Sequence, residues 1–350
     1  MSRIALMTDA WHPQVNGVVT ALSALVSELH RAGDEVRVIH PGRFVTVPLP
    51  TYREIRLAAV PYPGVARRLK RWQPDAIHIA TEGPCGMAAW LYCQRHGLHF
   101  TTSFHTRFPE YVHARLPFLP VSLGYRVLAR FHGAADATMV STPPLADFLR
   151  ERGFSNLKQW ARGVDTERFR PLASDVLANL PRPIFMSMGR VAVEKNIQAF
   201  LDLDLPGSKV VVGDGPAFQS LSRRYPEVHW LGLKLGDDLV RHLSAADCLV
   251  FPSRTDTLGL VLLEAMACGV PVAAYPVTGP SQVVDLGETG VLDEDLRAAA
   301  LAALALDGDT CRRQAERWSW AASAREFRHN LVPARQSGRA AILRPQRRPG

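Results

Sequence analysis

A short apolar run, a loop and an amphipathic helical pattern recur along the whole chain, and this alternation is the strongest constraint on its fold. Apolar runs typical of buried strands open each half, at Ile4–Thr8 and Ile184–Met188, and recur after them. Helical periodicity fills the intervals, as at Val18–Ala32 and Leu260–Cys268. Strands that alternate with helices form parallel sheets with crossover helices. We therefore predict an α/β protein.

The length of 350 residues and the repetition of this opening predict two domains. Each half begins with a strand, a glycine-containing loop and a helix, which is how a doubly wound domain begins. Because Arg170-Pro171 interrupts the pattern, we expect one domain at 1–170 and another at 171–332. Residues 333–350 are rich in Arg, Pro and Gly and are expected to be disordered. Ligands bind such sheets at the carboxyl ends of the strands, which predicts a site in a cleft between the domains.

Charge is distributed unevenly along the chain. Residues 1–165 hold 19 Lys and Arg against 12 Asp and Glu, residues 166–332 hold 17 against 21, and the tail adds five Arg. A basic first half fits an anionic partner, which could be a nucleic acid, an anionic membrane surface or a phosphorylated substrate. Five scattered cysteines disfavour a disulfide framework, and we find neither a signal-peptide pattern nor an 18-residue apolar run. We therefore expect a cytoplasmic protein.

The run T-D-T-L-G-L-V-L-L-E carries the strongest functional pattern. Asp256 lies in a loop after a strand, and Glu264 lies about one turn inside the helix that follows, in an otherwise apolar stretch. A buried carboxylate needs partners, and these two could hydrogen-bond the two ends of one polyhydroxylated ligand. The alternative is a solvated Asp and a surface Glu in an ordinary strand–helix unit. The helix start could also bind a phosphate through the N–H groups of Gly259, Leu260 and Val261.

Two cations follow the first strand of the second half. Arg190 and Lys195 lie in the run G-R-V-A-V-E-K-N, which begins at Gly189, where a strand leads into a helix. Two cations at such an edge could neutralise a leaving diphosphate, although a solvated basic loop would show the same residues. The turn V-G-D-G-P, which contains Gly213, leaves room for a nucleotide but matches neither a dinucleotide fingerprint nor a Walker pattern.

These three segments, in this order, resemble the retaining glycosyltransferases of family four, which have the GT-B fold of two Rossmann-like domains facing a cleft. The shared pattern is G-R-x-x-x-E-K-N, then V-G-x-G-P, then a carboxylate pair leading into G-L-V-x-x-E-A-M-A-x-G-x-P. The first half adds D-A-W-H-P-Q-V-N-G-V and S-F-H-T-R-F-P-E-Y, and the join resembles the family's N-G-V-D-x-x-x-F turn. The resemblance extends to about Asn330.

The resemblance implies a role for each matching position. Arg190 and Lys195 correspond to the diphosphate clamp and Glu264 to the ribose ligand. Asp256 corresponds to the residue that contacts the transferred sugar, where the family usually has Glu, so the sugar preference is open. The remaining positions expected at the donor are the loop glycine Gly17, which is only a partial match, His105 near the sugar, and Gly189 and Gly213.

The resemblance also implies catalysis without a metal. Asp202-Leu-Asp204 and Asp293-Glu-Asp295 match a D-x-D metal pattern that is common by chance, whereas similar GT-B enzymes use cations of the protein instead. We expect no cofactor and a nucleotide sugar as substrate. Other histidines, His78, His99 and His132, are interpreted as structural.

One branch of the family, which includes GDP-mannose-dependent α-mannosyltransferases and enzymes that glycosylate diacylglycerol from UDP-sugars, is the most similar. Mannosyl transfer to a lipid or glycan acceptor is our first choice, and a UDP-sugar donor is the alternative. Peripheral attachment to the inner face of an anionic membrane is expected from the apolar stretch Leu116–Phe131 and from basic residues, although a core helix with snorkelling arginines would look alike. The basic residues are Arg53, Arg56, Arg67, Arg68, Lys70 and Arg71.

Other classes of protein explain the sequence less well. A GT-B sugar-nucleotide epimerase would need two further acid–base groups that we cannot assign. A non-catalytic basic binding protein would explain the charge but not Arg190, Lys195, Asp256 and Glu264, and no nucleic-acid-binding motif is visible. A nicotinamide dehydrogenase is disfavoured because its glycine fingerprint is missing.

Overall fold

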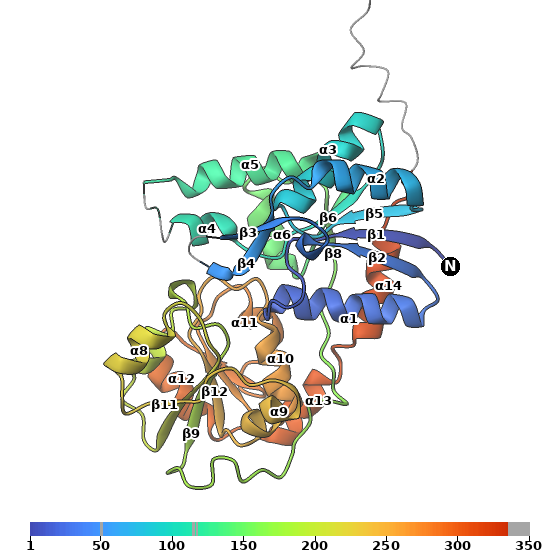
Figure 1. The fold of residues 1–350 in the computed structure, drawn as a ribbon. Helices are drawn as coiled ribbons and strands as arrows, with labels where there is room; N and C mark the ends of the chain where they lie inside the picture. The colour runs from blue at the N-terminus through green and yellow to red at the C-terminus, as the bar shows by residue number, and fades with distance from the viewer. Residues whose placement is uncertain (50–51, 114–115, 117, 335–350) are drawn as a thin grey trace, which may run out of the picture. The chain divides into compact units, whose positions relative to one another are not determined.

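The computed structural model describes residues 1–49, 52–113, 116 and 118–334, with the backbone alone at 49 and 52–55. These residues form two compact units (Figure 1). Unit 1 comprises Met1–His105, Ser122–Ala161 and the chain from Ala324 onward, and unit 2 comprises Thr106–Val121 and Arg162–Ser323. The expected domains, 1–170 and 171–332, are contiguous, whereas each unit is assembled from separate stretches of chain. Of the expected tail 333–350, only Pro333 and Ala334 lie within the described residues.

Unit 1 contains a parallel six-stranded sheet in the order β2-β1-β5-β6-β7-β8. Its strands are β1 (Arg3–Met7), β2 (Glu35–Ile39), β5 (Ala76–Ile79), β6 (Thr101–Ser103), β7 (Ala137–Val140) and β8 (Leu157–Gln159). Its helices are α1 (Gly17–Arg31), α2 (Tyr62–Trp72), α3 (Pro84–His96), α5 (Val121–Gly133) and α6 (Pro143–Arg150), with the 3-10 turn η1 (Pro41–Arg43). A hairpin of β3 (Thr46–Leu49) and β4 (Tyr52–Ala58) completes it.

The central strands of this sheet are buried on both faces, and β1 accordingly reads as a continuous apolar run after Arg3. Alternate residues of β1 enter two different cores: Ile4 and Leu6 pack with leucines of α1, and Ala5 and Met7 pack with residues of α2 and α3. The side of α1 also receives Phe327, which returns from the far end of the chain. Helices on both faces of a parallel sheet confirm the predicted doubly wound fold in unit 1.

Unit 2 contains a second parallel six-stranded sheet, in the order β11-β10-β9-β12-β13-β14. Its strands are β9 (Ile184–Met188), β10 (Ser208–Val212), β11 (His229–Trp230), β12 (Cys248–Phe251), β13 (Val272–Ala274) and β14 (Gly290–Leu292). Its helical segments are α4 (Phe108–His113), η2 (Val193–Lys195), α7 (Gln198–Leu201), α8 (Phe218–Arg224), α9 (Gly236–Ser244), α10 (Leu260–Ala267), α11 (Pro280–Val283), α12 (Leu296–Ala303) and α13 (Gly308–Ala315). The last helix, α14 (Trp320–Asn330), begins in unit 2 and ends in unit 1.

The second sheet is also covered on both faces. Ile184 and Met186 of β9 pack into a core with α9, α10 and α13, and Phe185 between them packs into a core with α7 and α12. All five cysteines are buried and free. None of the helices within the described ranges is both long and apolar enough to cross a membrane.

Candidate donor site

The carboxyl ends of neighbouring strands bring the sequence-predicted residues of unit 2 to one edge of its sheet. β9 is hydrogen-bonded to both β10 and β12, so the loops that follow these three strands are neighbours. The loop after β9 carries Arg190 and leads to Lys195, and the loop after β12 carries Asp256. The sequence therefore places the two cations and a carboxylate where a doubly wound sheet binds ligands.

Glycines allow the loops after β9 and β10 to approach each other backbone to backbone. A Cβ atom on Gly213 would lie 1.8 Å from the carbonyl oxygen of Gly189, and one on Gly215 would lie 2.4 Å from that of Val191. Gly189 N–H donates to Val212 O at 2.9 Å, and Val191 N–H donates to Asp214 O at 3.0 Å. The V-G-D-G-P turn is therefore a tight packing element beside Arg190.

Lys195 and Asp256 form an ion pair at this edge. The Nζ–Oδ1 distance is 2.5 Å, and the side chains are 26% and 16% exposed. Burial is the largest single influence on Lys195 and favours the neutral amine. The charge of Asp256, its hydrogen bond to Lys195 and the charges of Tyr111 and Glu194 together outweigh burial and raise the pKa of Lys195 above its ordinary value. The second oxygen, Oδ2 of Asp256, is buried and accepts no hydrogen bond from the described residues. A buried carboxylate oxygen without a donor is a suitable acceptor for a ligand hydroxyl.

Two side-chain contacts hold the Lys195 turn against the Asp256 loop. Asn196 adopts a left-handed conformation with φ +51° and donates through Nδ2 to Pro252 O at 3.1 Å. Thr255 Oγ1 donates to Glu194 O at 3.1 Å. The ion pair is therefore set by interactions on both sides of it rather than by two flexible side chains alone.

The helix that follows carries the second carboxylate. Gly259 has φ +86° and precedes α10, whose first residues are Leu260 and Val261. Glu264 lies in the fifth position of this helix and is partly buried. Burial raises the pKa of Glu264 to about 7, and the charge of Arg168 opposes that rise. Burial makes ionisation of Glu264 unfavourable, and the rest of its helix is apolar. A carboxyl group in such a place is better explained by ligand binding than by exposure at the surface.

The two expected site residues of the first half lie in unit 1. Gly17 is the exposed first residue of α1, and the Asn16 side chain caps that helix by accepting from the N–H groups of Val18 and Val19 at 3.0 Å. His105 follows β6, and its Nε2 is 2.9 Å from Ser103 Oγ. The structure thus brings Arg190, Lys195 and Asp256 to one edge of unit 2 and describes Gly17 and His105 within unit 1.

Sequence reasoning missed Tyr111, which lies in α4 and belongs to unit 2. Its phenol hydrogen-bonds with Thr255, and the charges of Lys195 and Asp256 act on it. Burial is the largest cause of its raised pKa. Tyr111 closes the quoted run S-F-H-T-R-F-P-E-Y, and that run was the available signal.

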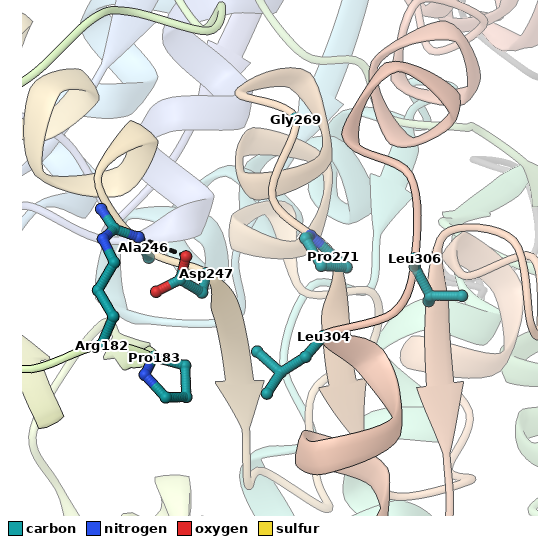
Figure 2. A pocket seen from close by; sticks show the side chains of 8 residues that line it. All are labelled: Arg182, Pro183, Ala246, Asp247, Gly269, Pro271, Leu304 and Leu306. Carbon is teal, nitrogen blue, oxygen red and sulfur yellow. Dashed lines mark hydrogen bonds and ion pairs between the residues drawn. The ribbon is translucent and has the colours of Figure 1, made fainter. Parts of the chain in front are cut away.

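A hollow of the second sheet lies at its opposite edge (Figure 2). It is lined near the amino ends of β9, β12 and β13, where Arg182 forms an ion pair with Asp247. Its other lining residues are Pro183, Ala246, Gly269, Pro271, Leu304 and Leu306. It contains none of the predicted site residues, and the chemistry of the carboxyl edge makes that edge the better candidate.

The carboxylates of the D-x-D runs have other partners. Asp202 Oδ1 accepts from the Tyr225 hydroxyl at 2.5 Å, and Asp295 caps α12. In the part of the chain that the structure describes, no three His, Cys, Asp or Glu side chains are grouped as a metal site. The expectation of a metal-free reaction stays a prediction.

Comparison with known proteins identifies the family. Residues 15–168 match the family described as Glycosyltransferase Family 4, and residues 182–307 match the one described as Glycosyl transferases group 1. The sulfoquinovosyl transferase SQD2 of Arabidopsis thaliana is 27% identical, over 95% of this chain and 74% of its own. A GDP-mannose-dependent α-mannosyltransferase of Mycobacterium tuberculosis is 27% identical over 83% of each chain.

Two further likenesses extend this result. An α-monoglucosyldiacylglycerol synthase of Streptococcus pneumoniae is 26% identical over 86% of this chain and 78% of its own. The structure of a sucrose-phosphate synthase from Thermosynechococcus elongatus has a TM-score of 0.76 and 24% identity, covering 94% of this chain and 98% of that one. With two Rossmann-like parallel sheets and these matches over both halves, the chain belongs to glycosyltransferase family four and has the GT-B fold.

Proposed function

We propose that the protein is a retaining glycosyltransferase that transfers an α-mannosyl group from GDP-mannose to a lipid or glycan acceptor. The observation that carries the proposal is the Lys195–Asp256 pair at the same end of the sheet as Arg190, because that end offers cations for a diphosphate and an acceptor for a sugar hydroxyl. The GDP-mannose donor is supported by the Mycobacterium tuberculosis relative, which has that specificity in its name.

In this proposal the donor contacts both partners of the ion pair, which stays in place. The diphosphate approaches Lys195 and Arg190, a sugar hydroxyl donates to Asp256 Oδ2, and the ribose hydroxyls donate to Glu264. As the bond between the anomeric carbon and the phosphate oxygen breaks, that oxygen accepts the proton of the acceptor hydroxyl on the same face of the sugar. The new glycosidic bond forms there, and the cations stabilise the charge that develops on the departing diphosphate. No covalent enzyme nucleophile is required.

A UDP-sugar-dependent transfer to diacylglycerol is the second candidate. It is favoured by the α-monoglucosyldiacylglycerol synthase relative, which is matched over 86% of this chain. Asp256 also stands where the family usually has Glu, and its shorter side chain leaves more space for the transferred sugar. The same cations and carboxylates would serve either donor.

A donor panel distinguishes these candidates. Purified protein is incubated with GDP-mannose, UDP-glucose and UDP-galactose, each with diacylglycerol, a lipid extract or a free glycan, and products are analysed by mass spectrometry. We expect a mannosylated product whose anomeric configuration is α by NMR. If only a UDP-sugar gives a product, mannosyl transfer is wrong and the second candidate is supported. A β-linked product would contradict retention, and epimerised donor without any transfer would contradict glycosyl transfer.

We further propose that the acceptor is met at an anionic membrane surface, to which α5 attaches. Leu123 and Val127 are four residues apart, as are Arg126 and Arg130, and each pair lies three residues from a member of the other, so the four side chains form one stripe of this helix. All four are exposed, with Leu123 at 44% and Val127 at 60%. Exposed apolar side chains beside arginines are typical of helices that lie in an anionic lipid interface. The buried residues of α5 are Tyr125, Phe131 and His132, and the exposed stripe supports attachment at a surface over a core helix with snorkelling arginines.

Replacing Arg126 and Arg130 by alanine should weaken binding to anionic vesicles by about 30-fold, since each basic residue near such a surface contributes about 1 kcal/mol. Co-sedimentation with vesicles of increasing phosphatidylglycerol content, at two salt concentrations, measures the effect. The double change of Arg223 and Arg224, in the last turn of α8, is the matched control. A chain that ends at Ala334 removes the five tail arginines. If only this truncation abolishes binding, α5 is not the attachment site.

A further inference from the structure

Polar side chains continue along one face of β6 and beyond its end. The register pairs His78 of β5 with Thr101 of β6. Because side chains alternate along a strand, Thr101 and Ser103 share the face on which His78 lies. His105 continues the same alternation past the carboxyl end of the strand. One face of two buried strands therefore leads from the interior of unit 1 to His105, the residue that the sequence predicts beside the donor sugar.

Hydrogen bonds connect these side chains in series. Thr101 Oγ1 is 2.8 Å from His78 Nδ1, His78 Nε2 is 3.1 Å from Ser103 Oγ, and Ser103 Oγ is 2.9 Å from His105 Nε2. The Ser103 hydroxyl also lies 3.5 Å from Ala80 O, a longer and weaker contact. The two imidazole rings are thus joined through a single hydroxyl group.

Aromatic rings enclose the series. The ring centroid of His78 lies 4.8 Å from that of Phe327 and 6.2 Å from that of Trp160, and both contacts are edge-to-face. The ring centroids of His105 and Trp160 lie 5.8 Å apart in a third edge-to-face contact. His78, Thr101, Ser103 and both aromatic residues are fully buried. Neither the inner imidazole nor the hydroxyl can exchange its partner for bulk water, so the hydrogen-bond pattern is fixed by the fold.

A hydroxyl between two imidazoles couples their tautomers. If His78 Nε2 carries the proton and donates to Ser103, the Ser103 hydroxyl donates to His105 Nε2, and the proton of a neutral His105 is then on Nδ1. If His105 Nε2 carries the proton, Ser103 donates inward to His78 and every bond reverses. In the first arrangement His105 Nδ1 is a hydrogen-bond donor, and in the second it is an acceptor.

We propose that His78 and Ser103 are positioning residues that fix the ring orientation and the tautomer of His105. The proposal deepens the proposed function, on which it rests where it concerns catalysis, because His105 is the residue expected beside the donor sugar. A sugar hydroxyl can then meet a nitrogen whose role as donor or acceptor is set before binding, which lowers the cost of orienting the donor. His78, interpreted from the sequence as structural, receives a functional role.

The ring nitrogens of the histidines report the tautomer directly. Two-bond ¹H–¹⁵N spectra of the ¹⁵N-histidine-labelled full chain distinguish Nδ1–H from Nε2–H, and the His105→Asn variant assigns the signal of His105. We expect one tautomer of His105 in the wild type and a mixture in Ser103→Ala. Ser103→Thr, which keeps the hydroxyl, should restore the single tautomer.

The opposite face of β6 supplies the matched control. Thr102 is equally buried, but its hydroxyl bonds His132 and Thr138 instead. Thr102→Ala should therefore leave the tautomer of His105 unchanged. A wild-type tautomer in Ser103→Ala, or the same mixture in Thr102→Ala, would overturn the proposal.

Kinetics test the catalytic part separately. With the donor found in the panel, and at a temperature well below the melting temperature of every variant, Ser103→Ala should lower kcat about tenfold while Ser103→Thr keeps it, since a small misplacement of a positioned group has effects of this size or larger. Unchanged kcat in Ser103→Ala would refute the catalytic role. If no donor is turned over by the wild type, the proposed function fails, and the NMR spectra still decide whether the series fixes the tautomer.

Discussion

Replacement of Lys195 by alanine should lower the turnover of the donor by about 30- to 1,000-fold, which corresponds to the loss of about 2–4 kcal/mol of transition-state stabilisation. The reason is the position of its ammonium group, which Asp256 and the Asn196 turn hold at the edge where the departing diphosphate gains charge. Arg190→Ala should have an effect of the same size. Steady-state kinetics with saturating donor measure both variants.

The controls must separate a lost cation from a damaged fold. Lys195→Ala also leaves Asp256 without its ion-pair partner in a partly buried site, and this can destabilise unit 2. Arg182→Ala removes the partner of Asp247 at the opposite edge of the same sheet and should keep normal turnover. Near-normal turnover in both Lys195→Ala and Arg190→Ala would show that these cations do not bind the leaving group.

Replacement of Glu264 by glutamine should stabilise the free protein at high pH while weakening donor binding. The pKa of Glu264 is about 7 in the folded chain and near 4.5 in an unfolded one. Its ionisation therefore costs more in the folded state, and stability falls as the pH rises from about 4.5 through 7. Above that range Glu264→Gln removes a penalty on the order of 1–3 kcal/mol, and near pH 4.5 it has little effect.

Melting temperatures at pH 5 and pH 8, with and without the nucleotide diphosphate, test this expectation. At pH 8 without nucleotide, the melting temperature of the variant should be higher than that of the wild type. Addition of the nucleotide should raise the melting temperature of the variant by less than it raises that of the wild type. Wild-type affinity for the nucleotide should also fall as the pH drops below about 7, because only the ionised carboxylate accepts two hydrogen bonds. Glu227→Gln, at an exposed position, is the control. A variant that is less stable at pH 8 with unchanged affinity would make Glu264 a structural residue.

The sequence was informative where one local rule acts. Buried parallel strands read as apolar runs, so β1, β9 and β12 could be predicted. The residues that follow such strands lie at the carboxyl ends of the sheet whichever strands are paired. The edge strands β8 and β14 were missed because β8 is short and little buried and β14 begins with a glycine. The β3–β4 hairpin was missed as well, because it lies outside the repeating pattern.

The site was predictable as a set of residues but not as a set of contacts. Lys195 pairs with Asp256, and Tyr111 joins them. These contacts depend on how the fold brings together segments that are far apart in the sequence. The hydrogen bonds of His78 follow from the register of β5 and β6, which no residue pattern specifies. Pairings of this kind are fixed by tertiary structure and carry no local signal.

The return of the chain to unit 1 has a consequence for biosynthesis. Phe327 is fully buried there and contacts His78 and Trp160, so the core beside α1 stays incomplete until the last helix has been made. A nascent chain that has just left the ribosome with residues 1–161 holds a sheet with an open apolar gap. We expect it to associate with chaperones until residue 327 emerges, whereas the stretch from Arg162 to Ser323 can collapse earlier. The two halves of this enzyme would then mature in the reverse of the order in which they are translated.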